Sequence, residues 1–313
     1  MTTSVLLTQL VLGVLAQTII LTNDDGWAVA HVRAQFDALD DAGYDVVLSA
    51  PTENKSGTGS SSATPTPLTQ PCQFNTCPTG SPAEGHNASN PRLNWVNAFP
   101  VDSVRYGIQT LAPQFFGSKP DFVVSGPNVG TNLGNVNGSG TVGAACEAAI
   151  EGIPSTAFSG STGSQVSYTT LTTQPTSLNT IAARIYSQLT VQYLNALLSS
   201  SESSSSPGTE PILPPNISVN VNYASISGNG CTDVKNWKFV ATRLRPDSSA
   251  MDAQTWTCGR DHLPDETSVN RSGGCWVSVS VMDARSKGDV GAEVQGIVFG
   301  RLESGGLVFS CFE

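Results

Sequence analysis

The sequence predicts an α/β protein whose core is a Rossmann-like, doubly wound and mostly parallel sheet. Residues 19–21, Ile-Ile-Leu, are apolar, rich in β-branched side chains and too few for a helix, so they predict a buried strand. Asn-Asp-Asp-Gly at 23–26 is typical of a turn, and a helical pattern follows it directly. Strand, acidic turn and helix in this order open a doubly wound domain, where ligands bind at the carboxyl ends of the strands.

The first helix is predicted by apolar side chains that recur on one face. Val29, Val32, Phe36 and Leu39 have helical spacing, and Gly43 is placed to cap the C-terminus of this helix. Further strands are expected at 44–50, 121–126, 155–159, 217–222, 276–281 and 296–299. Further helices are expected at 104–111, 142–150 and 178–198. Residues 64–91 are expected to be an excursion without periodicity, and the serine-rich run 199–206 a flexible linker.

The composition excludes nucleic-acid polymers as partners and indicates a secreted protein. The chain carries 25 acidic against 15 basic residues, a formal net charge of −10, so it would be repelled by a nucleic-acid polymer. Only 13% of the residues are charged, while Ser, Thr and Asn abound, which favours a secreted protein. Residues 1–16 are mostly apolar, end in a small-residue cleavage pattern and are too short to span a bilayer. They predict a signal peptide, with a buried N-terminal strand or helix as the alternative, and no membrane partner after its removal.

The seven cysteines fit an oxidising compartment better than the cytosol. Cys146 lies in a helical context, where we expect a buried small hydrophobe. Cys72 and Cys77 would close a tight loop and are the favoured pair. The sequence leaves open how the other four pair, namely Cys231, Cys258, Cys275 and Cys311.

Asp24 and Asp25 are the first candidate site residues. Two adjacent carboxylates at the end of a buried strand repel each other unless a cation or a shared proton lies between them. A hard divalent ion, which prefers oxygen ligands, is the natural occupant. Adjacent aspartates are also common as turn and helix-cap residues, so the pair alone is weak evidence for a metal.

Two further loops are expected at the same edge of the sheet. The Gly- and Ser-rich loop around Ser56 follows the second strand, and a Gly- and Asn-rich segment, 128–141, follows the strand at 121–126. Ser139 to Thr141 would lie at a helix N-terminus, where free N–H groups and the helix dipole favour an anion. Each loop alone could be a linker or a tight turn. Together they offer oxygen ligands for a metal and amides for a phosphoryl group, as metal-assisted phosphoester hydrolysis requires.

Five sequons permit N-glycosylation of a secreted protein, at Asn54, Asn87, Asn137, Asn216 and Asn270. Two of them, Asn54 and Asn137, fall within the loops of the candidate site. A glycan there would obstruct the site, so we expect these two to be unmodified.

Several motifs, taken in order, resemble one known family. Ile-Leu-Thr-Asn-Asp-Asp-Gly ends at Gly26, and Ala-Pro at 50–51 precedes Ser-Gly at 56–57. Val-Ser-Gly-x-Asn-x-Gly-x-Asn-Leu-Gly and Ser-Gly-Thr-Val-Gly-Ala-Ala then follow. The order and spacing across residues 17–160 are similar to those of the SurE (survival protein E) phosphatase and nucleotidase family.

This resemblance implies one divalent metal ion, Mg²⁺ or Mn²⁺, and hydrolysis of phosphomonoesters such as nucleoside monophosphates. Carried over position by position, the implied metal ligands are Asp24, Asp25, Ser56 and Asn128. The segment implied to hold the substrate phosphate contains Asn132, Ser139, Gly140 and Thr141. Asp24 and Asp25 would be the catalytic residues, with a water on the metal, or Asp24 itself, attacking phosphorus in line.

The chain departs from the family in one loop and in its C-terminal half. At 98–102 it reads Ala-Phe-Pro-Val-Asp where the family has Gly-Thr-Pro-Ala-Asp, beside the substrate. The Cys-rich insertion, the signal-like start and the serine-rich linker resemble the secreted fungal branch, whose usual activity is acid phosphatase. Family members exchange C-terminal hairpins between subunits. The resemblance therefore implies a core at 17–160, a helix plus β-hairpin-containing extension at 161–313 packed on it, and a homodimer or larger homo-oligomer.

Two other functions are alternatives. A non-catalytic module on the same scaffold would bind a nucleotide or phosphate without turnover, although all four implied metal ligands are present. A nucleotide- or sugar-using transferase would need a long Gly-rich loop after the first strand, where Asn-Asp-Asp-Gly stands instead. Asp261 and His262 offer another acid–base pair, but side chains of this kind in a polar loop are more often solvated.

Overall fold

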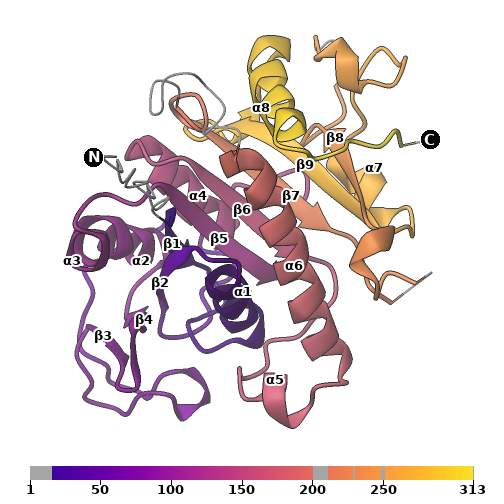
Figure 1. Cartoon of the computed structure of the whole chain (residues 1–313). Helices are drawn as coiled ribbons and strands as arrows, with labels where there is room; N and C mark the ends of the chain where they lie inside the picture. The colour runs from indigo at the N-terminus through magenta and orange to yellow at the C-terminus, as the bar shows by residue number, and fades with distance from the viewer. Residues whose placement is uncertain (1–15, 200–210, 228–229, 248–250, 313) are drawn as a thin grey trace, which may run out of the picture.

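The computed structural model describes residues 16–199, 211–227, 230–247 and 251–312, without the side chain of Ser199. The predicted signal peptide, apart from residue 16, and the predicted linker, apart from residue 199, lie outside the described residues. Figure 1 shows one twisted sheet with helices on both faces. Along the sheet the strand order is β10-β9-β7-β6-β5-β1-β2-β4-β3, and β8 also pairs with β9.

The strands are β1 (Thr18–Thr22), β2 (Asp45–Pro51), β3 (Glu84–Asn87), β4 (Asn90–Val96), β5 (Phe122–Val129), β6 (Ser155–Gly160), β7 (Ile217–Tyr223), β8 (Lys238–Thr242), β9 (Trp276–Asp283) and β10 (Gly288–Asp289). The helices are α1 (Ala30–Asp41), α2 (Pro100–Tyr106), α3 (Ala112–Phe116), α4 (Gly140–Ile150), α5 (Thr170–Thr173), α6 (Leu178–Ser199), α7 (Glu266–Arg271) and α8 (Ala292–Ser304). From β4 through β2, β1, β5 and β6 to β7, neighbouring strands are parallel, which confirms the predicted fold class.

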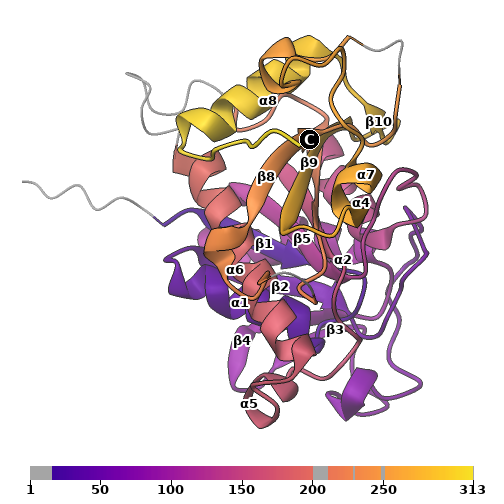
Figure 2. The ribbon, with the colours of Figure 1, turned by 90° about the vertical axis from the view of Figure 1, so that its right-hand side faces the viewer.

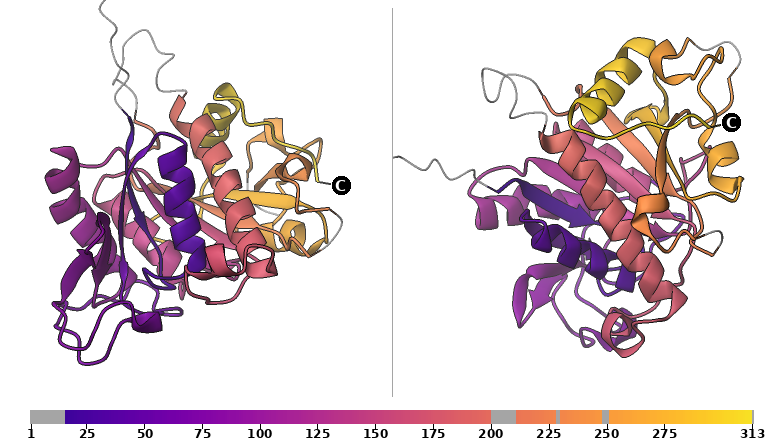
Figure 3. Two further views of the ribbon diagram at one scale, coloured as in Figure 1. Left: turned by 60° about the horizontal axis from the view of Figure 1, so that its bottom comes forward. Right: turned by 45° about the vertical axis from the view of Figure 1, so that its right-hand side comes forward.

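Alternate residues of β1 face two separate helix layers. Ile19 and Leu21 belong to the core under α1 and α6, which lie side by side in both views of Figure 3. Ile20 points to the opposite face and packs with residues of α2 and α4. A strand buried on both faces must be apolar throughout, which is why the Ile-Ile-Leu run could be recognised.

Helix α1 ends as the sequence predicts. Gly43 has φ +90° and donates its N–H to the carbonyl of Asp40, while the N–H of Tyr44 bonds to the carbonyl of Leu39. These two bonds form a Schellman motif, which satisfies the last carbonyls of the helix and needs a left-handed residue at Gly43.

The predicted strand at 296–299 is wrong, because these residues lie inside α8. Gln295, Val298, Phe299 and Leu302 are the buried side chains of this helix. Their spacing of three, one and three residues is that of a helix face, and it outweighs the β-branched and aromatic character of the short run.

Two other segments differ from expectation. The excursion at 64–91 contains β3 and the start of β4, which form an antiparallel hairpin at one edge of the sheet. The helix expected at 104–111 is instead the end of α2 followed by a π-helical turn at 107–111 that leads into α3. Gly107 explains the close packing, since a Cβ there would lie 2.6 Å from a methyl carbon of Ile20.

The C-terminal elements extend the same sheet. β7 pairs with β9 in antiparallel orientation, and β9 and β10 form a short hairpin. β8, β9, α7 and α8 gather at one end of the molecule (Figure 2). The sheet therefore continues across residue 160, and the division there into core and extension stays a prediction about organisation.

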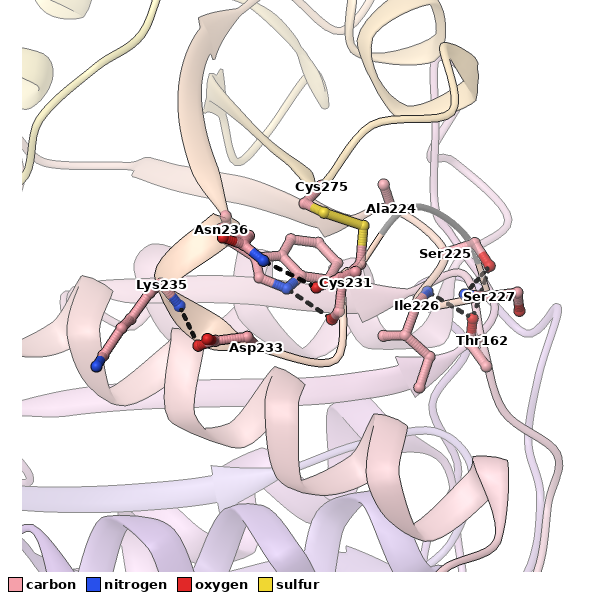
Figure 4. Close-up of a disulfide and its surroundings, with 12 residues drawn as sticks. Thr162, Ala224, Ser225, Ile226, Ser227, Cys231, Asp233, Lys235, Asn236 and Cys275 are labelled. Carbon is pink, nitrogen blue, oxygen red and sulfur yellow. Dashed lines mark hydrogen bonds between the residues drawn. A yellow bond between two sulfur atoms is a disulfide. The ribbon is translucent and has the colours of Figure 1, made fainter.

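Three disulfides tie the chain. The predicted pair Cys72–Cys77 is present, and the remaining pairs are Cys231–Cys275 and Cys258–Cys311. Cys146 is free and buried, as expected. Figure 4 shows Cys231–Cys275 beside the loops that follow β6 and β7, where the hydroxyls of Thr162 and Ser225 lie 3.0 Å apart. Within the part of the chain that the structure describes, no helix is long and apolar enough to cross a membrane.

Candidate active site

Asp24 and Asp25 stand at the carboxyl end of β1 and are almost inaccessible, with 2% and 0% of their surface exposed. The side chain of Asn23 closes the turn around them. Its Oδ1 accepts the N–H of Gly26 at 3.2 Å, and its Nδ2 donates to the Gly26 carbonyl at 3.1 Å. Gly26 has φ +109°, which an L side chain rarely adopts. The turn thus delivers both carboxylates to the edge of the sheet.

Asp24 is fixed by the first turn of α4. The hydroxyl of Thr141 donates to Asp24 Oδ1 at 2.6 Å, and the Thr141 N–H donates to Oδ2 at 3.1 Å. Gly140 permits this approach, because a Cβ on Gly140 would lie 2.8 Å from Asp24 Cβ and 3.1 Å from Pro100 Cγ.

Asp25 is fixed by the last residue of β5 and by the segment that follows β6. The N–H of Val129 donates to Asp25 Oδ2 at 2.8 Å, and Gln165 Nε2 donates to Oδ1 at 2.8 Å. Each carboxylate oxygen keeps a further lone pair. The hydrogen bonds therefore orient the carboxylates without using up their capacity to bind a cation.

Both carboxylates are electrostatically unfavourable without a positive charge. Burial raises the pKa of Asp24, and burial together with the charge of Asp24 raises the pKa of Asp25 well above its ordinary range. A divalent cation between them would reverse this, since it favours the ionised form of both groups.

Asn128 supplies an independent test of whether a metal fits. It lies in β5, 8% exposed, and its Nδ2 donates to the carbonyl of Gly130 at 2.7 Å. Its Oδ1 is buried and has no hydrogen-bond partner among the described residues. Buried polar atoms are normally satisfied. An unpartnered amide oxygen, one residue before the Val129 N–H that bonds to Asp25, suits an oxygen-preferring divalent ion.

The donor set at this site is limited to two carboxylates and neutral oxygens. No cluster of three or more His, Cys, Asp or Glu side chains that could hold a metal occurs among the described residues. A donor set of this composition would suit a hard divalent ion, which prefers oxygen ligands.

Ser56 belongs to a loop that lies against Asp24. The N–H of Lys55 donates to the backbone carbonyl of Asp24 at 2.7 Å. Ser56 itself is exposed, and its hydroxyl donates to Asn54 Oδ1 at 2.7 Å. Farther along, the N–H of Gly59 donates to the carbonyl of Gly138 at 3.0 Å, so the Ser56 loop also contacts the segment before α4.

The four residues implied to hold phosphate have different surroundings. Ser139 is the N-cap of α4, and its Oγ accepts the N–H of Val142. Both hydrogen-bond donors of Thr141 are engaged by Asp24, and Gly140 lies against Asp24 as well. Asn132 Nδ2 donates to Ser159 Oγ at 2.8 Å. The structure thus brings three of them to the N-terminus of α4 and the fourth to the loop after β5.

The sequence analysis missed several polar residues near these loops. Nothing local distinguishes Gln165, which contacts Asp25 from 140 residues away. Asn220 and Asn222 could have been identified from the sequence, because they place two polar side chains on one face of a strand that is buried on both sides. Their Nδ2 atoms both donate to the Asn132 carbonyl at 2.9 Å.

Asp261 and His262 lie in the C-terminal part of the sequence. His262 Nδ1 is 4.0 Å from Asp252 Oδ2, and Asp252 pairs with Arg243. In the described ranges no hydrogen bond or ion pair connects His262 with Asp24 or Asp25.

The sequence and the fold are similar to those of known proteins. The family model "Survival protein SurE" matches residues 19–246. An "Acid phosphatase" of Yarrowia lipolytica is 32% identical over 91% of this chain and 85% of its own. A "5'-nucleotidase SurE" of Gloeobacter violaceus is 38% identical over 45% of this chain, which spans about half of that relative. The solved SurE structure from Aquifex aeolicus has a TM-score of 0.58 at 22% identity, covers 85% of this chain and 93% of its own, and supports the fold.

Proposed function

This chain belongs to the Survival protein SurE family, and from that membership we propose that it is a divalent-metal-dependent phosphomonoesterase. Its substrates would be nucleoside monophosphates or other small phosphate esters, from which it releases inorganic phosphate. The names of the relatives, acid phosphatase and 5'-nucleotidase, support phosphomonoester hydrolysis. The observation that carries the metal dependence is the pair of buried carboxylates, together with the unpartnered Oδ1 of Asn128, whose neighbour Val129 bonds to Asp25.

One divalent ion, Mg²⁺ or Mn²⁺, would be held by Asp24, Asp25, Ser56 and Asn128. When bound, such an ion polarises phosphoryl oxygens and lowers the pKa of a coordinated water. The chain's own contribution is orientation. Thr141 holds Asp24, while Val129 and Gln165 hold Asp25, so both carboxylates are in place before the substrate arrives.

The N-terminus of α4 would receive the phosphate. The positive end of its dipole favours an anion, while its Thr141 and Val142 N–H groups already bond to Asp24 and Ser139. The Ser139 cap and Gly140 keep this turn next to Asp24. Asn132 would add a polar contact from the loop after β5. The reaction adds the oxygen of water to phosphorus and breaks the bond to the ester oxygen, which leaves with a proton. A water or Asp24 would be the nucleophile.

The protein would act outside the cell. The acid phosphatase relative and the three disulfides support secretion after removal of residues 1–16. We include in the proposal glycosylation at the partly exposed Asn87 and Asn216, with Asn54 and Asn137 unmodified. The proposal also includes a homodimer or larger assembly built through the C-terminal extension.

Phosphate release by the purified secreted protein tests this function. The substrates are p-nitrophenyl phosphate and a panel of nucleoside monophosphates, with Mn²⁺, with Mg²⁺ and with chelator. Asp24→Asn and Asp25→Asn are expected to lose turnover while remaining folded. Asp40→Asn, at an exposed position of α1, is the matched control.

The result that would overturn the proposal is specific. A folded protein that binds Mn²⁺ and phosphate without releasing phosphate from any ester would be a binding module. Turnover that survives both chelator and the Asp24→Asn change would exclude the metal mechanism.

A further inference from the structure

Glu266 is a completely buried carboxyl group outside the metal site. It is the first residue of α7, and 0% of its surface is exposed. Its Oε1 accepts the N–H of Gly134 at 2.7 Å, and its Oε2 accepts from Asn220 Nδ2 and Ser280 Oγ, both at 3.0 Å. No ion pair involves Glu266 within the described ranges of the chain.

Burying a carboxyl group without a cationic partner costs free energy, and the raised pKa of Glu266 reflects that cost. Burial raises the pKa of Glu266 to about 8. Removing a carboxyl from water costs free energy even when hydrogen bonds compensate for part of it. A hydrophobic residue at this position would pack without that cost. The hydrogen bonds of Glu266 therefore indicate a role other than stabilising the core.

The hydrogen bonds of Glu266 connect it to residues 130–134, the segment that follows β5. Asn220, which Glu266 holds, also donates its Nδ2 to the carbonyl of Asn132 at 2.9 Å. Asn222 exchanges two bonds with Asn132: it accepts the Asn132 N–H and donates to the Asn132 carbonyl, each at 2.9 Å. Glu266 therefore anchors the segment at Gly134 directly and at Asn132 through Asn220.

This segment needs anchors from outside. Residues 130–134 connect β5, which carries Asn128, with the turn that leads to α4, and they contain no helix or strand. Gly130 and Gly134 have φ +106° and +71°. Glycines leave an unstructured segment many alternative conformations, so ordering it costs more entropy than ordering other residues.

We propose that Glu266 is a positioning residue that, through Gly134 and Asn220, holds Asn132 and the backbone of residues 130–134 in the conformation that receives the substrate phosphate. The assignment of phosphate as the ligand rests on the proposed function. The positioning itself does not, because it follows from contacts between α7, β7 and the loop.

Glu266→Ala is the first variant, and Glu266→Gln tests rescue. At pH 6 the Glu266 carboxyl is protonated, so Gln is close to it in shape and in neutral charge. Asp265→Ala is the matched control. Asp265 caps α7 by accepting the Ser268 N–H at 3.0 Å, and within the described ranges no hydrogen bond or ion pair joins its side chain to residues 130–134. Asn220→Ala removes the hydrogen bonds through which β7 connects Glu266 to Asn132. It serves as the second variant should Glu266→Ala fail to fold.

Two measurements on the full chain at pH 6 with saturating Mn²⁺ are compared. Hydrogen exchange reports the protection of peptides that cover residues 130–134. Steady-state kinetics report KM and kcat for p-nitrophenyl phosphate and the Ki of inorganic phosphate. Loss of hydrogen bonds to a buried carboxyl predicts exchange, KM and Ki each raised about tenfold in Glu266→Ala, with a smaller effect on kcat. Asp265→Ala is expected to stay close to the wild type. Glu266→Gln should lie between the wild type and Glu266→Ala, because its Oε1 still accepts the Gly134 N–H while its NH2 group cannot accept from Asn220.

Each possible outcome tests a different part of the proposal. Unchanged exchange in both Glu266→Ala and Asn220→Ala would overturn the positioning role, whether or not the protein is a phosphatase. Faster exchange with unchanged KM and Ki would overturn the connection to phosphate. A wild-type protein that neither turns over esters nor binds phosphate would overturn the proposed function, and the exchange result would still decide whether Glu266 holds the loop.

Discussion

Thr141 binds Asp24 through two hydrogen bonds although 117 residues separate them in the sequence. Its hydroxyl and its N–H meet one carboxylate oxygen each, so the carboxylate plane is fixed relative to the axis of α4. Hydrogen bonds to a charged group in a buried site are stronger than neutral ones.

Thr141→Val removes the hydroxyl and keeps the shape of the side chain. We expect kcat/KM for p-nitrophenyl phosphate to fall at least about tenfold, because the buried Asp24 carboxylate loses a short hydrogen bond. Thr141→Ser, which keeps the hydroxyl, should retain most activity. Thr190→Val is the control, since this buried threonine of α6 bonds to Tyr186 and Tyr223. Equal losses in Thr141→Val and Thr190→Val would contradict the prediction.

Gln165→Ala removes the amide that donates to Asp25 Oδ1. Residues that orient a metal-binding carboxylate typically change metal affinity by about 10–100-fold when mutated. We therefore expect the Mn²⁺ concentration for half-maximal activity to rise by that order, with little change in melting temperature. Gln109→Ala, which loses an exposed bond to Glu151, is the comparison. A Mn²⁺ requirement identical to that of the wild type would show that Gln165 does not orient Asp25.

Gly140→Ala tests the close approach of α4 to Asp24. The added Cβ would lie 2.8 Å from Asp24 Cβ, so either the helix or the aspartate must move, and activity should fall by at least about tenfold. Gly138→Ala is the matched control two residues earlier, where a Cβ would meet nothing within 4 Å. Phosphate release by the two variants is compared under the same conditions. A Gly140→Ala variant as active as Gly138→Ala would mean that this distance is not critical.

Glu266 should make the protein less stable as the pH rises toward 8. Burial, and then the charge of Asp289, raise its pKa from 4.5 to about 8, so between these values the folded state keeps a proton that the unfolded state has lost. The unfolding free energy therefore decreases with pH across this window. His31 acts in the opposite direction, because burial lowers its pKa to about 4, but its contribution is complete above pH 6.5.

The window from pH 6.5 to 8 thus isolates Glu266 from His31. With saturating Mg²⁺, we expect the melting temperature of the wild type to fall across this window by several degrees more than that of Glu266→Gln. Thermal unfolding at both pH values provides the measurement. Parallel curves for the two proteins would contradict the assignment of this pH dependence to Glu266.

Most of the central sheet could be predicted because its strands are buried on both faces and stand out as short apolar runs. The run at 296–299 misled for the same reason: over four residues, an apolar segment of a helix and a buried strand look alike. The hairpin β3–β4 was missed because it lies at the edge of the sheet and shows no clear alternation.

Some residues of the candidate site could likewise be predicted from the sequence, and others could not. Asp24, Asp25 and the loops around Ser56 and Asn128 were visible because each follows a strand that could be recognised. Gln165 and Glu266 were not visible, since their roles depend on contacts with residues 140 and 132 positions away. A single sequence carries no local signal for such pairings, and the metal and phosphate roles of the predicted residues stay predictions.

The dependence of Asp24 on Thr141 has a consequence for biosynthesis. β1 leaves the ribosome early, but the hydroxyl that holds its carboxylate is synthesised 117 residues later. At translation rates of roughly 5–20 residues per second, that interval is on the order of 6–23 s. For most of that interval neither β5 nor α4 has been synthesised. A nascent chain therefore cannot assemble the candidate site until about the first half of the protein has been made.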